Sequence, residues 1–264
     1  MKCVSEHMHS TVVAQPNHPP ASPLRLRTDS AVRGTLLLFA WAWSTIAMGA
    51  PHDHEPPVVL APGYSPLAFV PPKTGSYSLP SMGLAADGEV LDSDGKRLRL
   101  HDVIGDKPTV LSFIFTSCDD VNGCPLATYV MRSVHDALES DSGTAGKARL
   151  VSFSFDPVFD TPEVIAAYGA QFRAQDADWQ FLTTDGARNL DPILEAYGQW
   201  VIRDYDDAGN YRGTMSHILR VFLIDRDRQI RNIYSTSFLH ADTVANDIRT
   251  LLLEENPPAA VFGL

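Results

Sequence analysis

Residues 109–125 read TVLSFIFTSCDDVNGCP, and this stretch decides the fold. Its first seven residues are nearly all apolar, which is typical of a strand buried on both faces at the centre of a sheet. Pro125 suits the first turn of a helix, where its missing N–H leaves no hydrogen bond unmade. The stretch therefore predicts a buried strand, a short polar loop and a helix, in that order.

Strand and helix patterns alternate after this stretch. The apolar runs predict strands at residues 109–115, 150–155, 179–182, 219–224 and 229–234, the last two joined as a hairpin by a polar turn. Helical spacing predicts helices that begin at Pro125, near residue 160 and near residue 191, and a last helix over residues 241–254. This order predicts an α/β fold with a central mixed sheet flanked by helices on both faces.

Two of the helix starts carry capping signals. Asp160-Thr-Pro-Glu163 combines a capping Asp, a first-turn Pro and a Glu three residues on, so we expect Asp160 to cap this helix. Asp191-Pro192 predicts the start of the next one. The residues predicted to face inward are Val164, Ile165, Tyr168 and Phe172 in the first helix and Ile193, Leu194 and Tyr197 in the second.

The ends of the chain differ in composition from its middle. Residues 1–50 contain an apolar run, 35–50, that follows several arginines and ends in small residues; this indicates a signal peptide or N-terminal anchor. Residues 51–77 are proline-rich and predict an extended linker. The predicted α/β domain spans 78–256, with a short tail at 257–264. We expect an exported protein, periplasmic or anchored to the outer face of the inner membrane through residues 35–50.

The net charge and the cysteine content limit the classes of function that the chain can have. The formal net charge is -11, which argues against nucleic-acid binding because that function needs a basic surface. Of the three cysteines, Cys3 lies in the predicted leader, whereas Cys118 and Cys124 flank the loop after the central strand. Two close cysteines in an exported chain suggest a redox pair or a site for a soft metal. A disulfide that merely staples the loop is the structural alternative.

The position of this cysteine pair favours a functional site over a purely structural disulfide. Ligands bind at the carboxyl ends of strands in open α/β sheets, and both cysteines follow such an end. Cys124 opens the predicted helix, so we expect the helix dipole to lower its pKa. Cys118 lies on the loop and is free to move towards a metal or a partner.

Three motifs make the chain resemble the Sco/SenC family, whose members are thioredoxin-fold copper proteins that assemble the copper-A centre of cytochrome oxidase. The first is a strand followed by Cys, a spacer and Cys-Pro, here 118–125. The second is Asp-Pro-x-x-Asp-Thr-Pro-Glu after a strand, here 156–163. The third is a histidine before an apolar strand that ends in Ile-Asp, here 217–225. The resemblance covers roughly residues 78–254.

The resemblance implies a thioredoxin-like fold and a copper site formed by Cys118, Cys124 and His217. Thiolates suit Cu(I), and imidazole suits both oxidation states of copper. The implied function is that of a metallochaperone, which holds copper as its cofactor and delivers it to a client copper protein such as a cytochrome oxidase subunit. Met215 is a soft side chain close to His217; packing is its favoured role, and that of an auxiliary metal ligand is the alternative.

The chain departs from the family pattern in two places. The family usually has three residues between the cysteines, whereas this chain has five, as if Asn122-Gly123 had been added. Because Asn-Gly forms turns readily, we expect the longer loop still to bring both sulfur atoms together. Phe159 stands where the family often has Arg, and no function follows from that change.

The other histidines give no comparable signal. His52 and His54 lie in the proline-rich segment and are interpreted as part of a solvated tail, although copper binding there is the alternative. His101, His135 and His240 are interpreted as surface or capping residues. The polar segment 204–213 predicts a loop or hairpin near His217, with aspartates that tune the site or meet a client as the alternative to a solvated loop.

Three other functions compete with copper delivery. A thiol–disulfide oxidoreductase would use the same cysteine pair to keep a client's cysteines reduced, but such enzymes usually have two residues between the cysteines and a proline where this chain has His217. A peroxiredoxin-type peroxidase ranks lower, because Thr116 and Cys118 are too close for its Thr-x-x-Cys pattern. A binding module with a purely structural disulfide ranks last.

Overall fold

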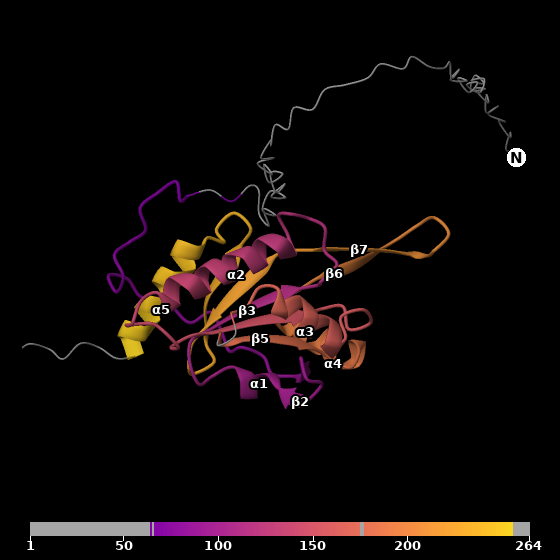
Figure 1. The fold of residues 1–264 in the computed structure, drawn as a ribbon, viewed down its shortest axis with the longest axis horizontal. Coiled ribbons are helices and arrows are strands. Elements are labelled where there is room, and N and C mark those ends of the chain that lie inside the picture. The colour runs from indigo at the N-terminus through magenta and orange to yellow at the C-terminus, as the bar shows by residue number, and fades with distance from the viewer. Residues whose placement is uncertain (1–63, 65, 175–176, 256–264) are drawn as a thin grey trace, which may run out of the picture. The chain divides into compact units, whose positions relative to one another are not determined.

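The computed structural model describes residues 64, 66–174 and 177–255 (Figure 1). The predicted signal or anchor segment, His52 and His54, and the tail at 257–264 lie outside the described residues. The part of the predicted linker that is described, residues 66–77, contains no helix or strand. Within the described part of the chain, no helix combines the length and the apolar character that a membrane span requires.

The sheet has seven strands in the order β2-β1-β5-β4-β3-β8-β9. Its strands are β1 (Glu89–Asp92), β2 (Arg97–Arg99), β3 (Thr109–Ile114), β4 (Arg149–Ser154), β5 (Trp179–Thr183), β8 (Arg220–Ile224) and β9 (Ile230–Ser235). The helices are α1 (Leu100–Val103), α2 (Cys124–Glu139), α3 (Pro162–Ala170), α4 (Ala187–Ala196) and α5 (Ala241–Glu255). A separate two-stranded sheet consists of β6 (Val201–Tyr205) and β7 (Tyr211–His217).

The central strand is β3, as its sequence predicts. All six of its residues are buried. It pairs in parallel with β4, Ser112 opposite Ser152, and antiparallel with β8, Ser112 opposite Val221. Because β4 is also parallel to β5, the carboxyl ends of β3, β4 and β5 meet at one edge of the sheet. The mixed sheet and the β8–β9 hairpin that the sequence predicts are both confirmed.

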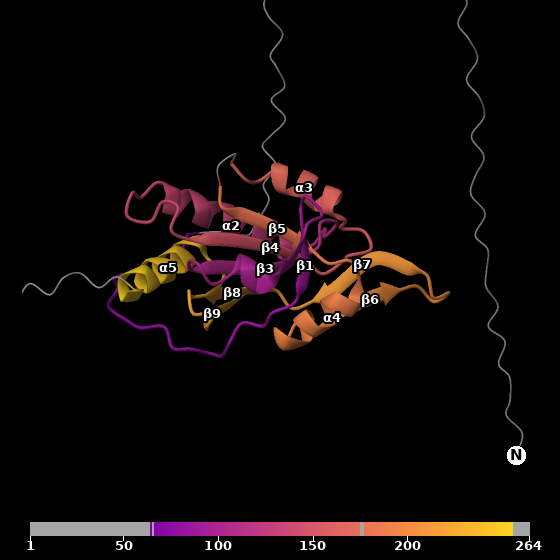
Figure 2. The ribbon, with the colours of Figure 1, turned by 90° about the horizontal axis from the view of Figure 1, so that it is seen from below.

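Helices cover both faces of the sheet, as predicted (Figure 2). Phe113 lies beside Phe153, which lies opposite Leu182, so Phe181 points to the other face. Tyr197, which follows α4, packs on the same face as Phe113, and the centroids of the two rings are 5.3 Å apart. On the face of Phe181 lies α3, where a Cβ atom at Gly169 would come within 2.6 Å of the Phe181 ring. Gly169 thus lets α3 approach the sheet closely.

Two helix starts differ from the predictions. The N-cap of α3 is Thr161, not Asp160, because the Asp160 carboxylate is held by side chains at the ends of β3 and β4. Helix α4 begins at Ala187 rather than at Asp191 and contains Pro192. It starts after Gly186, whose φ of 148° lies in a region that favours glycine. Pro192 is therefore an interior residue of this helix, where it removes a backbone hydrogen bond.

The inward-facing residues of these helices are confirmed with one exception. Ile193, Leu194 and Tyr197 are buried, and so is Ile165, but Val164 is 39% exposed. Helix α3 is turned so that Gly169 rather than Val164 faces the sheet.

The predicted loop or hairpin at 204–213 is the tip of the β6–β7 hairpin, which extends beyond the main sheet (Figure 1). Its register places Val201 opposite His217 and Arg203 opposite Met215. The hairpin is anchored to the domain by an ion pair of 3.7 Å between Arg203 and the buried Asp156. It thereby brings the last residues of β7 to the edge of the sheet where β3 ends.

Candidate metal centre

A tight loop joins β3 to α2 and carries both cysteines. Cys124 is the first residue of α2 and is 1% exposed, whereas Cys118 is only partly buried. Within the loop, the Asp120 carbonyl accepts a hydrogen bond from the Gly123 N–H at 2.8 Å, and the Asp120 carboxylate accepts one from the Asn122 N–H at 3.0 Å. A Cβ atom at Gly123 would crowd the Cys118 sulfur at 3.3 Å. The five-residue spacer therefore folds back and keeps the two thiols close enough for each to shift the pKa of the other.

The two thiols differ in acidity. The hydrogen bond from Cys124 lowers the pKa of Cys118 to about 6. The same hydrogen bond, with burial, raises the pKa of Cys124 well above its ordinary value, although its sulfur also accepts a hydrogen bond from the Phe115 N–H at 3.4 Å. The prediction that the helix start lowers the pKa of Cys124 is therefore wrong. At this helix start, burial and proton donation to Cys118 outweigh the helix dipole.

This difference predicts selective alkylation. In the reduced chain, iodoacetamide should modify Cys118 before Cys124, because Cys118 is both more exposed and more acidic. The rate should rise as the pH increases through about 6, since only the thiolate attacks. Timed quenching followed by peptide mass spectrometry measures both rates. Faster modification of Cys124, or a midpoint near the ordinary cysteine pKa of 9.0, would contradict the arrangement.

His217 ends β7 and lies against two buried aromatic rings. Its ring centroid is 4.7 Å from that of Phe155 and 6.2 Å from that of Phe115. Its Nε2 atom is buried and has no hydrogen-bond partner among the described residues. Burial lowers the pKa of His217, against the opposing charge of Asp120. The imidazole is therefore held in its neutral form, which is the form that binds metals.

Cys118 and His217 line the same pocket, which has a volume of about 350 Å³. The Cys loop forms one wall with Cys118 and Asp120, and β7 forms the other with Met215 and His217. Cys124 does not line the pocket. Within the described ranges, no three His, Cys, Asp or Glu side chains are close enough together to hold a metal ion. The structure thus places Cys118 close to Cys124 and in the same pocket as His217. It does not bring all three predicted ligands together.

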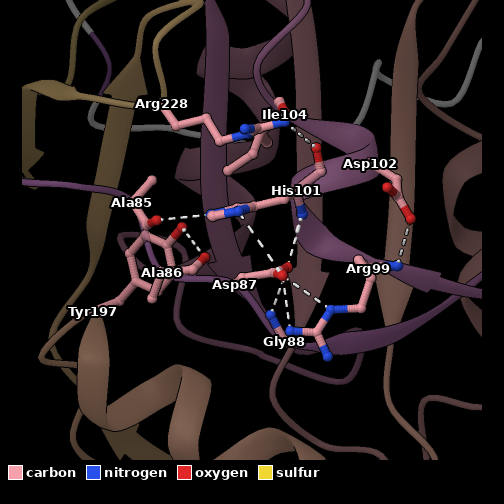
Figure 3. A network of polar contacts seen from close by, with 10 residues as sticks. All are labelled: Ala85, Ala86, Asp87, Gly88, Arg99, His101, Asp102, Ile104, Tyr197 and Arg228. Atoms are coloured by element: carbon pink, nitrogen blue, oxygen red, sulfur yellow. Dashed lines mark hydrogen bonds and ion pairs between the residues drawn. The ribbon is translucent and has the colours of Figure 1, made fainter.

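The other described histidines do not line this pocket. His101 is half-buried rather than on the surface, and its Nε2 lies 2.9 Å from the Ala85 carbonyl oxygen (Figure 3). Its backbone N–H donates to Asp87, whose carboxylate also pairs with Arg99. His135 is half-buried too. His240 has the predicted capping role, because its Nδ1 accepts a hydrogen bond from the Asp242 N–H in the first turn of α5.

Asp160 is a structural residue of the site whose role the sequence does not reveal. It is 1% exposed, and its carboxylate accepts hydrogen bonds from the Thr116 N–H at 3.0 Å and from the hydroxyls of Thr116 and Ser154. It therefore fixes the chain just before Cys118 to the end of β4. The Asp-Thr-Pro-Glu motif marks the residue, but its resemblance to a capping signal points to the wrong partner.

Comparisons with known proteins agree with the fold. The family model described as SCO1/SenC matches residues 84–253. A curated SCO1 protein homolog of Bacillus subtilis is 30% identical over 92 residues, which are 35% of this chain and 45% of that protein. The chain thus matches less than half of the length of this relative.

Solved structures share the architecture. The Arabidopsis thaliana ScoI structure, described as having copper bound, has a TM-score of 0.56 and 20% identity, and the match covers 65% of this chain and 99% of ScoI. ScoI of Bradyrhizobium japonicum, also described with copper bound, has a TM-score of 0.53 and 24% identity over 64% of this chain and 99% of that one. At these identities the structures establish the thioredoxin-like fold. Because the family model matches well over half of the chain, this protein belongs to the SCO1/SenC family.

Proposed function

We propose that this protein is an exported copper chaperone that holds Cu(I) through Cys118, Cys124 and His217 and delivers it to a client copper protein. The observation that carries the proposal is the buried Nε2 of His217, which has no hydrogen-bond partner within the described structure and shares a pocket with Cys118. A buried polar atom without a partner costs about 1–3 kcal/mol, so a ligand that uses its lone pair would remove this cost.

The donor chemistry of the three residues fits copper. Two thiolates and an imidazole are soft or intermediate donors that suit Cu(I). Cys118 is already acidic enough to be largely ionised at neutral pH, whereas Cys124 must lose its proton when the metal binds. The metal supplies the charge that favours this loss. Its binding also requires the Cys loop or β7 to shift, since the three ligands are not gathered in the structure.

The partial exposure of Cys118 supports the delivery of copper to a client. Cys118 is partly exposed on the loop, so a client's thiolate can reach copper bound beside it and take its place. Such ligand exchange needs no change in the oxidation state of the metal. The copper-A centre of cytochrome oxidase, which the family resemblance implies, is the client that we propose.

Export is part of the same proposal. Residues 35–50 act either as a signal peptide, which leaves the domain in the periplasm, or as an anchor, which holds it on the outer face of the inner membrane. Cell fractionation with an antibody against the domain tests this. The protein should appear in the periplasmic or membrane fraction, and its recovery from the cytoplasm alone would contradict export.

One observation favours a thiol–disulfide oxidoreductase as the second candidate. Cys118 has a pKa of about 6 and is partly exposed, and the buried Cys124 donates a hydrogen bond to it. An acidic attacking thiol with a buried second thiol is the arrangement that disulfide exchange uses. In that reaction the two thiols of the chain become a disulfide, and the disulfide of the client becomes two thiols.

Both candidates can be tested with one client domain. The full chain, reduced and loaded with one equivalent of Cu(I), is mixed with a reduced copper-A domain, and copper is measured in each protein after separation. In parallel, the reduced copper-free chain is mixed with the oxidised domain, and the free thiols of the domain are counted. We expect copper to move to the client. If thiols appear on the domain but no copper moves, the oxidoreductase is the better account.

A further inference from the structure

Met215 lies on the wall of the pocket that Cys118 and His217 line. It is 7% exposed, and over the last four residues of β7 Met215 is buried and His217 is partly buried, while Thr214 and Ser216 are exposed. Residues two apart on a strand are about 6.6 Å apart and point to the same side. The strand therefore places a thioether beside the imidazole, at the same pocket.

Three of the side chains that line the pocket are soft or intermediate donors. The groups that it offers include the sulfur of Cys118, the sulfur of Met215 and the imidazole of His217, and each of these is a ligand of copper in proteins. Cys124, by contrast, is 1% exposed and does not line the pocket. The pocket therefore offers the thioether of Met215 directly, whereas the thiol of Cys124 lies outside its lining.

We propose, building on the copper function above, that Met215 is a further Cu(I) ligand, contributed from β7 next to His217. Its thioether is neutral and soft, so it binds Cu(I) without having to lose a proton. Its three rotatable bonds let the sulfur turn to the metal from a fixed backbone position.

The backbone at Met215 is fixed by the facing strand. Met215 lies opposite Arg203 in the β6–β7 register, and the Arg203 guanidinium pairs with the buried Asp156 at 3.7 Å. This contact holds the hairpin to the domain at the level of Met215. The thioether is thus presented by an anchored strand, while the cysteine ligands come from a loop.

Selenium in place of sulfur reports directly on this contact. The full chain is produced with selenomethionine, reduced and loaded with one equivalent of Cu(I), and X-ray absorption is recorded at both the copper and the selenium edges. We expect a copper–selenium contact at both edges. The contact should disappear in Met215→Leu, a change that conserves volume. It should persist in the matched control Met131→Leu, because Met131 is 1% exposed inside the core and does not line the pocket.

Affinity gives a second readout. Competition with a Cu(I) chelator should show about a tenfold weaker Kd for Met215→Leu and no change for Met131→Leu. Copper that binds without a copper–selenium contact, or a contact that survives in Met215→Leu, would overturn this inference and leave the proposed function standing. A chain that takes up no Cu(I) would overturn the proposed function and this inference together.

Discussion

Replacing Asp160 with alanine should lower the free energy of unfolding by about 3 kcal/mol. The carboxylate is buried and accepts three hydrogen bonds from Thr116 and Ser154. Its removal leaves the buried Ser154 hydroxyl without this acceptor and releases the chain before Cys118 from the end of β4. Urea unfolding of the full chain, followed by tryptophan fluorescence, measures the change as a lower midpoint at an unchanged slope.

The matched control for Asp160 is Asp207, an exposed aspartate at the tip of the β6–β7 hairpin. Asp207→Ala should change the free energy of unfolding by less than about 0.5 kcal/mol. Equal effects of the two substitutions would show that Asp160 is not the structural clamp described above.

Replacing His217 with leucine should weaken Cu(I) binding at least about a hundredfold, because it removes a ligand itself. The same change should leave the fold as stable as before or slightly more stable. The buried Nε2 has no partner among the described residues, so an apolar side chain of similar reach loses no hydrogen bond there. Cu(I) competition and thermal unfolding of the full chain measure the two effects separately.

The cysteine pair provides an internal check on the His217 prediction. Cys118 and Cys124 should still form a disulfide in His217→Leu, since their contact does not involve the imidazole. The control His135→Leu should bind copper as the parent does, because His135 lies about 16 Å along α2 from Cys124. Unchanged copper affinity in His217→Leu would exclude His217 from the site.

Much of the fold can be predicted from the sequence because the central strands are strongly apolar. The run at 109–115 predicts β3 to within one residue, and the apolar runs near 150 and 220 predict its two neighbours. The strands β1 and β2 are not predicted. They are short and half exposed, so their residues carry no apolar run.

The wrong N-cap predicted for α3 and the wrong first residue predicted for α4 have the same origin. Asp160 and Asp191 each precede a proline by one or two residues, which is a local signal for a helix start. At Asp160 the tertiary hydrogen bonds to Thr116 and Ser154 replace the local cap, and at Asp191 the helix has already begun after Gly186. The local signals near a proline therefore identify both helices and place Pro162 at the start of α3, but they give the wrong N-cap for α3 and the wrong first residue for α4.

The candidate site is only partly predictable for a similar reason. The spacing of Cys118, Cys124 and the later His217 is visible in the sequence, and the fold brings Cys118 close to both others. The acidity of the thiols is not visible, because it depends on how deeply Cys124 is buried and on which thiol donates the hydrogen bond. The burial of Met215 is not visible either, because β7 is polar and contains glycine, so its sequence does not show which of its side chains line the pocket.

The most direct test of the account is the copper content of the reduced full chain. The chain is loaded with excess Cu(I), the excess is removed with a competing chelator, and the copper that remains is measured per chain for the parent, Cys118→Ser and Cys124→Ser. The account predicts one Cu(I) per parent chain and a clear loss in both variants, since each thiolate is a ligand. A parent chain that keeps no copper, or variants that keep as much copper as the parent, would contradict it.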